Sequence, residues 1–134
     1  MTITVEDVVA TLQEIVAEFG ADYVYKPPAE EEAYNADRWS ASSCLYVHKD
    51  KDTGNPIPGC LVAQVLHRKG VSLLDLAPHE GKSFFDFYER FDIDGDAARL
   101  LTTAQGYQDD NVAWGDAVAQ ALGDNDQYED DDDA

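Results

Sequence analysis

Apolar residues recur at the spacing of an α-helix along the first twenty positions of the chain. They are Val5, Val8, Val9, Leu12, Ile15, Val16 and Phe19. Polar residues such as Glu14 and Glu18 fall on the opposite face. Thr4 is placed to cap the start, Asp7 stands where a capping box has its acid, and Gly20 supplies a stop. The pattern predicts an amphipathic helix over 5–19, whose apolar face needs other elements to cover it.

Two short stretches that follow have strand composition. Tyr23–Lys26 is β-prone and precedes two prolines. Residues 44–48 also favour a strand and run into a turn rich in Asp, Gly and Asn at 49–55. Two such strands could pair, and a lone ribbon would have to pack on helices because it is only marginally stable.

Three further helical segments are indicated. Pro58 can begin a helix whose apolar stripe runs from Leu61 to Leu66, and a second short apolar run follows at 71–76. Asp94 or Asp96 can cap a helix that reaches Gln108. A turn at 109–111 leads to a helix over 112–122, which Gly123 ends. The sequence therefore predicts one mainly helical α+β domain over 1–123, with four or five helices and a small two-stranded β-ribbon.

Charge is unevenly distributed along the chain. The 134 residues hold 28 acidic and 9 basic side chains, for a net charge of −19, and no Lys or Arg follows Arg99. Residues 124–134 carry seven acids, so we expect a disordered acidic tail there. Direct binding to nucleic acid or to an anionic membrane is disfavoured because both require a basic face. The start lacks the basic region of a signal peptide, and no apolar run is long enough to span a membrane, so we expect a soluble, cytoplasmic protein.

Several patterns that could carry chemistry fail their tests. Cys60 could act with a histidine as a nucleophile, but no local signature supports this, and a small buried side chain is the simpler interpretation. The set Cys44, His48, Cys60 and His67 lacks the spacing of a zinc site. The run Asp92–Asp96 resembles the start of an EF-hand loop. Such a loop would need glycine at position 97 and glutamate at position 103, which here are Ala97 and Thr103. The segment 61–77 has the outline of a helix–turn–helix but no basic recognition face. We predict no enzyme activity, no cofactor and no metal.

An aromatic cluster lies between the predicted helices. It comprises Phe84, Phe85, Phe87, Tyr88 and Phe91. Aromatic side chains dominate core burial, so we interpret the cluster first as core and second as a subunit interface.

Two segments resemble a family of uncharacterised small acidic proteins of actinobacterial bacteriophages. They are PIPGCLVAQVLHRKGV (56–71) and QGYQDDNVAWGDAVAQA (105–121). The chain departs from the family's pattern at Ala63 and Asn111, where that pattern has glycine. The resemblance implies a phage context but no activity, because the family has no settled role. It also implies a shared scaffold of Cys60, Leu61, Val62, Gln108, Asp109, Trp114 and Gly115.

These observations favour a non-enzymatic factor that binds a host or phage protein through its acidic surface. In its sharpest form it mimics DNA and blocks a nucleic-acid-binding protein. The candidate binding residues are Asp109, Asp110, Trp114 and Asp116. Trp114 is first a packing residue and second a binding anchor, since tryptophan serves both roles. An alternative is a structural or assembly protein that self-associates through its aromatic surface, and a third is adaptation to high salt. The partner and the oligomeric state stay open.

Overall fold

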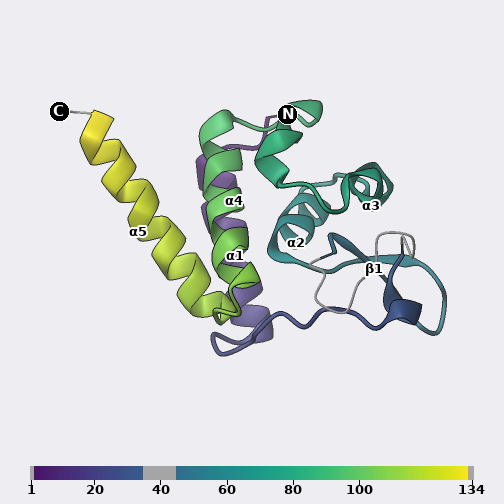
Figure 1. Ribbon diagram of the computed structural model, residues 1–134. Helices are drawn as coiled ribbons and strands as arrows, with labels where there is room; N and C mark the ends of the chain where they lie inside the picture. Colours follow the sequence, from purple (N-terminus) through teal and green to yellow (C-terminus); the bar gives the residue numbers. More distant parts are fainter. Residues whose placement is uncertain (1, 35–44, 133–134) are drawn as a thin grey trace.

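Helix α1 (Val5–Phe19) packs against three other helices and forms the centre of the fold. The computed structural model describes residues 2–34 and 45–132, with the backbone alone for 125–132. Helix α1 buries Val8, Leu12 and Ile15 against α2 (Leu61–Arg68), α4 (Gly95–Asp109) and α5 (Trp114–Asp132). Figure 1 shows α1 lying behind α4, with α5 leaning away from both toward the C-terminus.

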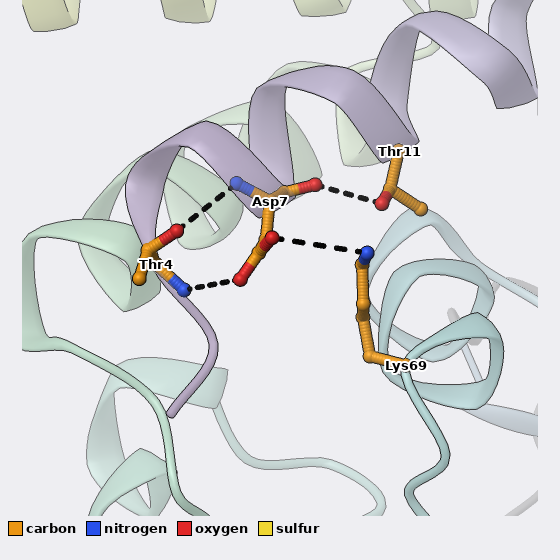
Figure 2. A network of polar contacts seen from close by, with 4 residues as sticks. All are labelled: Thr4, Asp7, Thr11 and Lys69. Carbon is orange, nitrogen blue, oxygen red and sulfur yellow. Dashed lines mark hydrogen bonds and ion pairs between the residues drawn. The ribbon is translucent and has the colours of Figure 1, made fainter. Parts of the chain in front are cut away.

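The start of α1 is fixed by the predicted capping box (Figure 2). Thr4 Oγ1 accepts the Asp7 N–H at 3.2 Å, and Asp7 Oδ2 accepts the Thr4 N–H at 3.0 Å. These bonds from Thr4 lower the pKa of Asp7, and the nearby Lys69 ammonium acts in the same direction. Thr11 Oγ1 also donates to the Asp7 carbonyl at 2.7 Å. Both the bounds and the cap of this helix are confirmed, as is the stop at Gly20, where φ is +97°.

The β-ribbon pairs β1 (Val47–Lys49) with β2 (Pro56–Pro58) in antiparallel register, with His48 opposite Ile57. The prediction of a strand at Tyr23–Lys26 is wrong. That segment is extended but joins no ladder, and its Tyr23 carbonyl instead accepts from the Trp114 N–H. The Leu45 N–H donates to the Tyr25 hydroxyl.

Helix α2 begins later than predicted, because Pro58 belongs to β2 and Cys60 is the N-cap. Its basic C-terminal end lies against the acidic side of α1. Arg68 Nη2 is 2.6 Å from Glu18 Oε2, and Lys69 Nζ is 4.0 Å from Asp7 Oδ1 (Figure 2). Ion pairs at the surface thus join the two helices, in addition to apolar packing inside.

Short helical turns connect α2 to α4. Helix α3 (Leu73–Leu76) starts at Ser72, whose Oγ accepts the Leu74 N–H at 3.2 Å. Three 3₁₀ turns follow it before α4: η3 (Ala77–His79), η4 (Phe84–Asp86) and η5 (Tyr88–Arg90). A further 3₁₀ turn, η1 (Glu30–Glu32), lies between α1 and β1. The aromatic cluster is divided. Phe84 and Phe87 are buried, as predicted for core, whereas Phe85 is 43% exposed.

Helix α5 starts two residues later and runs further than the sequence predicts. Its backbone is helical through Asp132, past the expected end at Gly123 and into the stretch expected to be a disordered tail. The described part of the chain therefore has five α-helices and one two-stranded sheet in a single domain, which confirms the predicted fold class. None of the helices in the described ranges is long and apolar enough to cross a membrane.

Candidate functional site: an acidic junction at the start of α5

The first turn of α5 is tied to the segment that follows α1. The Trp114 N–H donates to the Tyr23 carbonyl at 2.7 Å, and the Gly115 N–H donates to the Ala21 carbonyl at 3.0 Å. The first N–H groups of a helix have no partner within the helix, so these two carbonyls complete the helix start. The junction is therefore fixed by backbone bonds between segments more than ninety residues apart.

Gly115 permits a close contact at this junction. A β-carbon added there would lie 2.7 Å from Ala21 Cβ, 2.8 Å from its carbonyl oxygen and 2.9 Å from its Cα. Such distances are well inside van der Waals contact, so a larger residue would force the two segments apart. The sequence-based expectation of close packing at Trp114–Gly115 is confirmed.

Trp114 lies inside the protein. Its side chain is 0% exposed, and its ring contacts Phe19 and Tyr23 edge-on, with centroids 5.0 and 4.6 Å away. Its indole Nε1 is buried and has no hydrogen-bond partner among the described residues. A buried ring cannot touch a partner, so Trp114 orders the junction by packing and is not part of the binding surface.

Four exposed aspartates surround this junction and define what we call the acidic junction. Asp22 lies between the two carbonyls that accept from α5, Asp116 follows Gly115, and Asp109 and Asp110 close α4. The structure thus brings the predicted Asp109, Asp110 and Asp116 to one corner of the fold. Asp22 was missed, because only the contact between Ala21 and Gly115 places it there.

Ion pairs among the described residues join other carboxylates. The ion pairs formed within the described residues join Arg68 to Glu18, Lys69 to Asp7, Lys51 to Glu32 and Arg99 to Asp96. None of them involves Asp22, Asp110 or Asp116. Asp109 Oδ1 accepts a hydrogen bond from Gln108 Nε2 at 3.1 Å, which orients that carboxylate. Within the described residues, Asp22, Asp110 and Asp116 therefore form no ion pair.

One side-chain bond holds α5 beyond the junction. The Tyr107 hydroxyl donates to Asp124 Oδ2 at 2.5 Å, and this bond is the main reason that the pKa of Tyr107 is raised. It links α4 to α5 at the first residue of the acid-rich end, residues 124–134. This bond and the junction therefore hold α5 at two separate points, with the uncharged residues 117–123 between Asp116 and Asp124.

Buried polar side chains support the frame around the site, and sequence patterns did not reveal them. Gln108 Oε1 accepts the Leu61 N–H at 2.9 Å, and Gln105 Oε1 accepts the Val62 N–H at 3.1 Å. These two glutamines of α4 cap α2, whose N-cap Cys60 makes no side-chain bond. The pattern of apolar spacing carries no signal for such long-range caps.

A buried glutamate anchors the β-ribbon. Glu80 is 1% exposed, and its two carboxylate oxygens accept the N–H groups of Tyr46 at 2.6 Å and Val47 at 3.0 Å. Burial raises the pKa of Glu80 to about 7, although the two backbone bonds act in the opposite direction. This carboxylate holds the turn after α3 to the start of β1.

The residues that the sequence suggested for catalysis or metal binding lie apart from one another or have structural roles. Cys60 is fully buried, His48 Nε2 lies 2.9 Å from the Tyr25 hydroxyl, and Asp94 is the N-cap of α4. Cys44 lies outside the described residues. Within the described ranges, no three His, Cys, Asp or Glu side chains are grouped so that they could hold a metal ion.

Comparison of the chain with protein-family models, with curated proteins and with solved structures finds no match in any of the three.

Proposed function

We propose that this chain is a non-enzymatic protein-binding factor and that the acidic junction, continued by α5, is its recognition surface. The single observation that carries the proposal is the placement of Asp22, Asp110 and Asp116 on a corner held by backbone hydrogen bonds. Fixed carboxylates favour a cationic partner because the partner's charges meet a surface that is already ordered.

The sharpest form of the proposal is DNA mimicry. A DNA-binding protein presents a basic groove that contacts phosphates, and a fixed cluster of carboxylates where helices meet offers charge of the same sign. The partner would then be a nucleic-acid-binding protein of a host cell or of a phage. The resemblance to small phage proteins supports a phage-encoded origin and hence action in the host cytoplasm.

The direct experiment is capture of partners on the immobilised chain from an actinobacterial lysate, with elution by rising salt. A DNA-binding protein should be retained at low ionic strength, released as salt screens the charges, and displaced by duplex DNA. Binding that duplex DNA leaves unchanged would contradict mimicry.

Matched variants locate the surface. Neutralising Asp22, Asp110 and Asp116 to Asn should weaken binding of the captured protein by about tenfold or more, since each lost charge pair contributes about 0.5–1 kcal/mol. A control with Glu6, Glu14 and Glu89 changed to Gln removes the same charge from exposed positions elsewhere. Equal weakening by the two triple variants would show that net charge alone drives binding.

Deletion of 124–134 distinguishes the junction from the end of the chain. Binding that survives the deletion supports the acidic junction as the main contact. Binding that disappears assigns recognition to the acid-rich end instead.

Self-association is the second candidate, and one observation favours it. Phe85 is 43% exposed and stacks on Tyr88 with a centroid distance of 4.9 Å, so part of the aromatic cluster faces solvent. Sedimentation of the intact chain and of a Phe85→Ser variant tests it. A dimer that dissociates in the variant supports assembly, and a monomer in both rejects it.

A further inference from the structure

Two backbone turns between α3 and α4 hold three basic side chains near one another. The Lys82 N–H donates to the His79 carbonyl at 3.1 Å, and the Arg90 N–H donates to the Phe87 carbonyl at 3.1 Å. The rings of His79 and Phe87 stack, with centroids 4.3 Å apart and an interplanar angle of 10°. Because both turns begin at stacked rings, Lys82 and Arg90 each end a turn that starts at the same pair of rings.

Phe87 fixes the position of this stack. Its ring is 5% exposed and meets the buried rings of Phe84 and Tyr46 edge-on, with centroids 5.4 and 5.6 Å away. The imidazole of His79 therefore lies on a wall that belongs to the core. It is ordered before any ligand arrives, so binding has little ordering cost at this ring.

One nitrogen of His79 is available to a ligand. Nδ1 is buried and has no hydrogen-bond partner among the described residues, which leaves Nε2 as the ring nitrogen that can meet a ligand. Burial is the main reason that the pKa of His79 is lowered, and the positive charges of Arg90 and Lys82 lower it further. Both cations thus act on this imidazole, and an anion beside it would offset their repulsion.

These two cations lack a carboxylate partner in the part of the chain that the structure describes. Lys82 and Arg90 are exposed, and no ion pair of the described residues includes either. The exposed Asp86 and Glu89 of the same segment form no ion pair with them. The carboxylate of Glu80 is turned inward, where it accepts two N–H groups at the start of the β-ribbon.

The end of α2 has the same three residue types in a different state. His67, Arg68 and Lys69 follow one another there, but Arg68 is paired with Glu18 and Lys69 with Asp7. Those cations already have counter-charges, so that end is a reference against which the residues between α3 and α4 can be compared.

From this arrangement we propose that His79, Lys82 and Arg90 bind a phosphate dianion, free or as a monoester of a small molecule. A dianion meets both cations and the imidazole, whereas a carboxylate monoanion leaves one cation without a counter-charge. The planar guanidinium of Arg90 matches two phosphate oxygens, and Lys82 supplies a compact charge.

The proposed site lies away from the acid-rich helix. In Figure 1 the residues between α3 and α4 lie on the other side of α4 from α5. Exposed charges more than about 8 Å apart are largely screened at physiological ionic strength, so distant carboxylates act weakly on an anion held here. The proposal is independent of protein binding by the acidic junction.

Titration of the intact chain by two-dimensional NMR tests the proposal at about pH 7.5, where phosphate is largely dianionic. The probes are inorganic phosphate, glycerol phosphate and acetate, at constant ionic strength. At least one phosphate compound should shift the amide signals of 79–82 and 87–90 at about 10 mM or below, and acetate should bind about tenfold more weakly. Tighter binding of the ester or of the free ion identifies which of the two the site takes. Absence of shifts with both phosphates, or equal binding of acetate, overturns the proposal.

The histidine signals distinguish a local site from general screening. Bound phosphate should raise the pKa of His79, because a nearby negative charge favours the protonated imidazole. The imidazole signals of His67, whose neighbouring cations are paired, should stay in place. An equal response of the two histidines would show screening alone and overturn the assignment.

Matched variants confirm the location. Lys82→Gln and Arg90→Gln, both at exposed positions, should each weaken phosphate binding by about fivefold or more. Lys26→Gln removes the same charge from an exposed position elsewhere and should leave binding unchanged. Binding of native strength in both Lys82→Gln and Arg90→Gln would place the phosphate elsewhere and overturn the proposal.

Discussion

Gln108 of α4 caps α2 from outside, since its Oε1 accepts the N–H of Leu61 at 2.9 Å across 47 residues of sequence. The pair is buried, with Gln108 1% exposed and Leu61 fully inside. Helix α2 therefore depends on α4 for a hydrogen bond that most helices obtain from their own N-cap residue.

Replacing Gln108 by Ala should leave the Leu61 N–H buried and unpaired. An unsatisfied buried donor costs about 1–3 kcal/mol, so we expect a loss of that size in the free energy of unfolding by urea. Gln120→Ala, at an exposed position of α5, is the control and should change stability little. A loss below about 0.5 kcal/mol for Gln108→Ala would show that the cap contributes little.

Gly115→Ala should destabilise the chain although alanine favours helices. The added carbon would meet the backbone of Ala21 at 2.8–2.9 Å, and such overpacking costs about 1–3 kcal/mol. Gly123→Ala, where no atom lies within 4 Å, should instead gain up to about 1 kcal/mol. The contrast between the two thermal midpoints is the measurement, and midpoints that move in the same direction would contradict the close contact.

The pH dependence of stability should carry the signature of Glu80. Its pKa rises from the ordinary 4.5 to about 7 on folding, so the folded chain holds the proton more tightly. The stabilisation from this group is complete below pH 4.5 and is lost as the pH rises through 7, by about 3 kcal/mol. Glu80→Gln cannot titrate and should lose this dependence.

The measurement is the free energy of unfolding by urea at pH 5 and pH 8 for both chains. Glu14→Gln, at an exposed position of α1, removes the same charge and should retain the native slope. An unchanged slope in Glu80→Gln would show that the raised pKa does not govern the stability of the fold.

The helix at the acid-rich end of α5 should become more stable at low pH. Residues 124–134 hold seven acids and no base, and negative charges near a helix C-terminus oppose its dipole. Protonation removes that repulsion. The circular dichroism of the intact chain minus that of a chain ending at residue 123 should therefore show more helix at pH 4 than at pH 7. A difference spectrum that does not change with pH would contradict this.

Local features were predictable from the sequence because their causes are local. Thr4, Asp7 and the spacing of apolar residues determine α1 within one stretch of chain, and the structure has the predicted bounds. Of the two strands of the β-ribbon, only β1 was predicted, since the expected strand at 44–48 overlaps it. Pro56–Pro58 lacks two N–H donors and looks unlike a strand, yet it pairs as β2 because the turn at 50–55 brings it beside β1.

The remaining features depend on contacts between distant segments. Asp22 joins the acidic junction only through the bond from Gly115 to Ala21, and Glu80 is buried only because β1 supplies two N–H donors. A single sequence does not encode such pairings in composition or spacing. Packing of Trp114 was predicted, but its partners were not, because the rings that contact it lie on α1 and on the segment after it.

The anchoring of α5 at two points also decides which of its carboxylates are held in place. Its base is fixed where the Gly115 N–H donates to the Ala21 carbonyl, and Asp124 is held to α4 by the Tyr107 hydroxyl. Residues 125–132 extend about 12 Å beyond the second point at the rise of an α-helix. A substitution at Tyr107 would therefore release the outer half of the helix while leaving the carboxylates at its base in position.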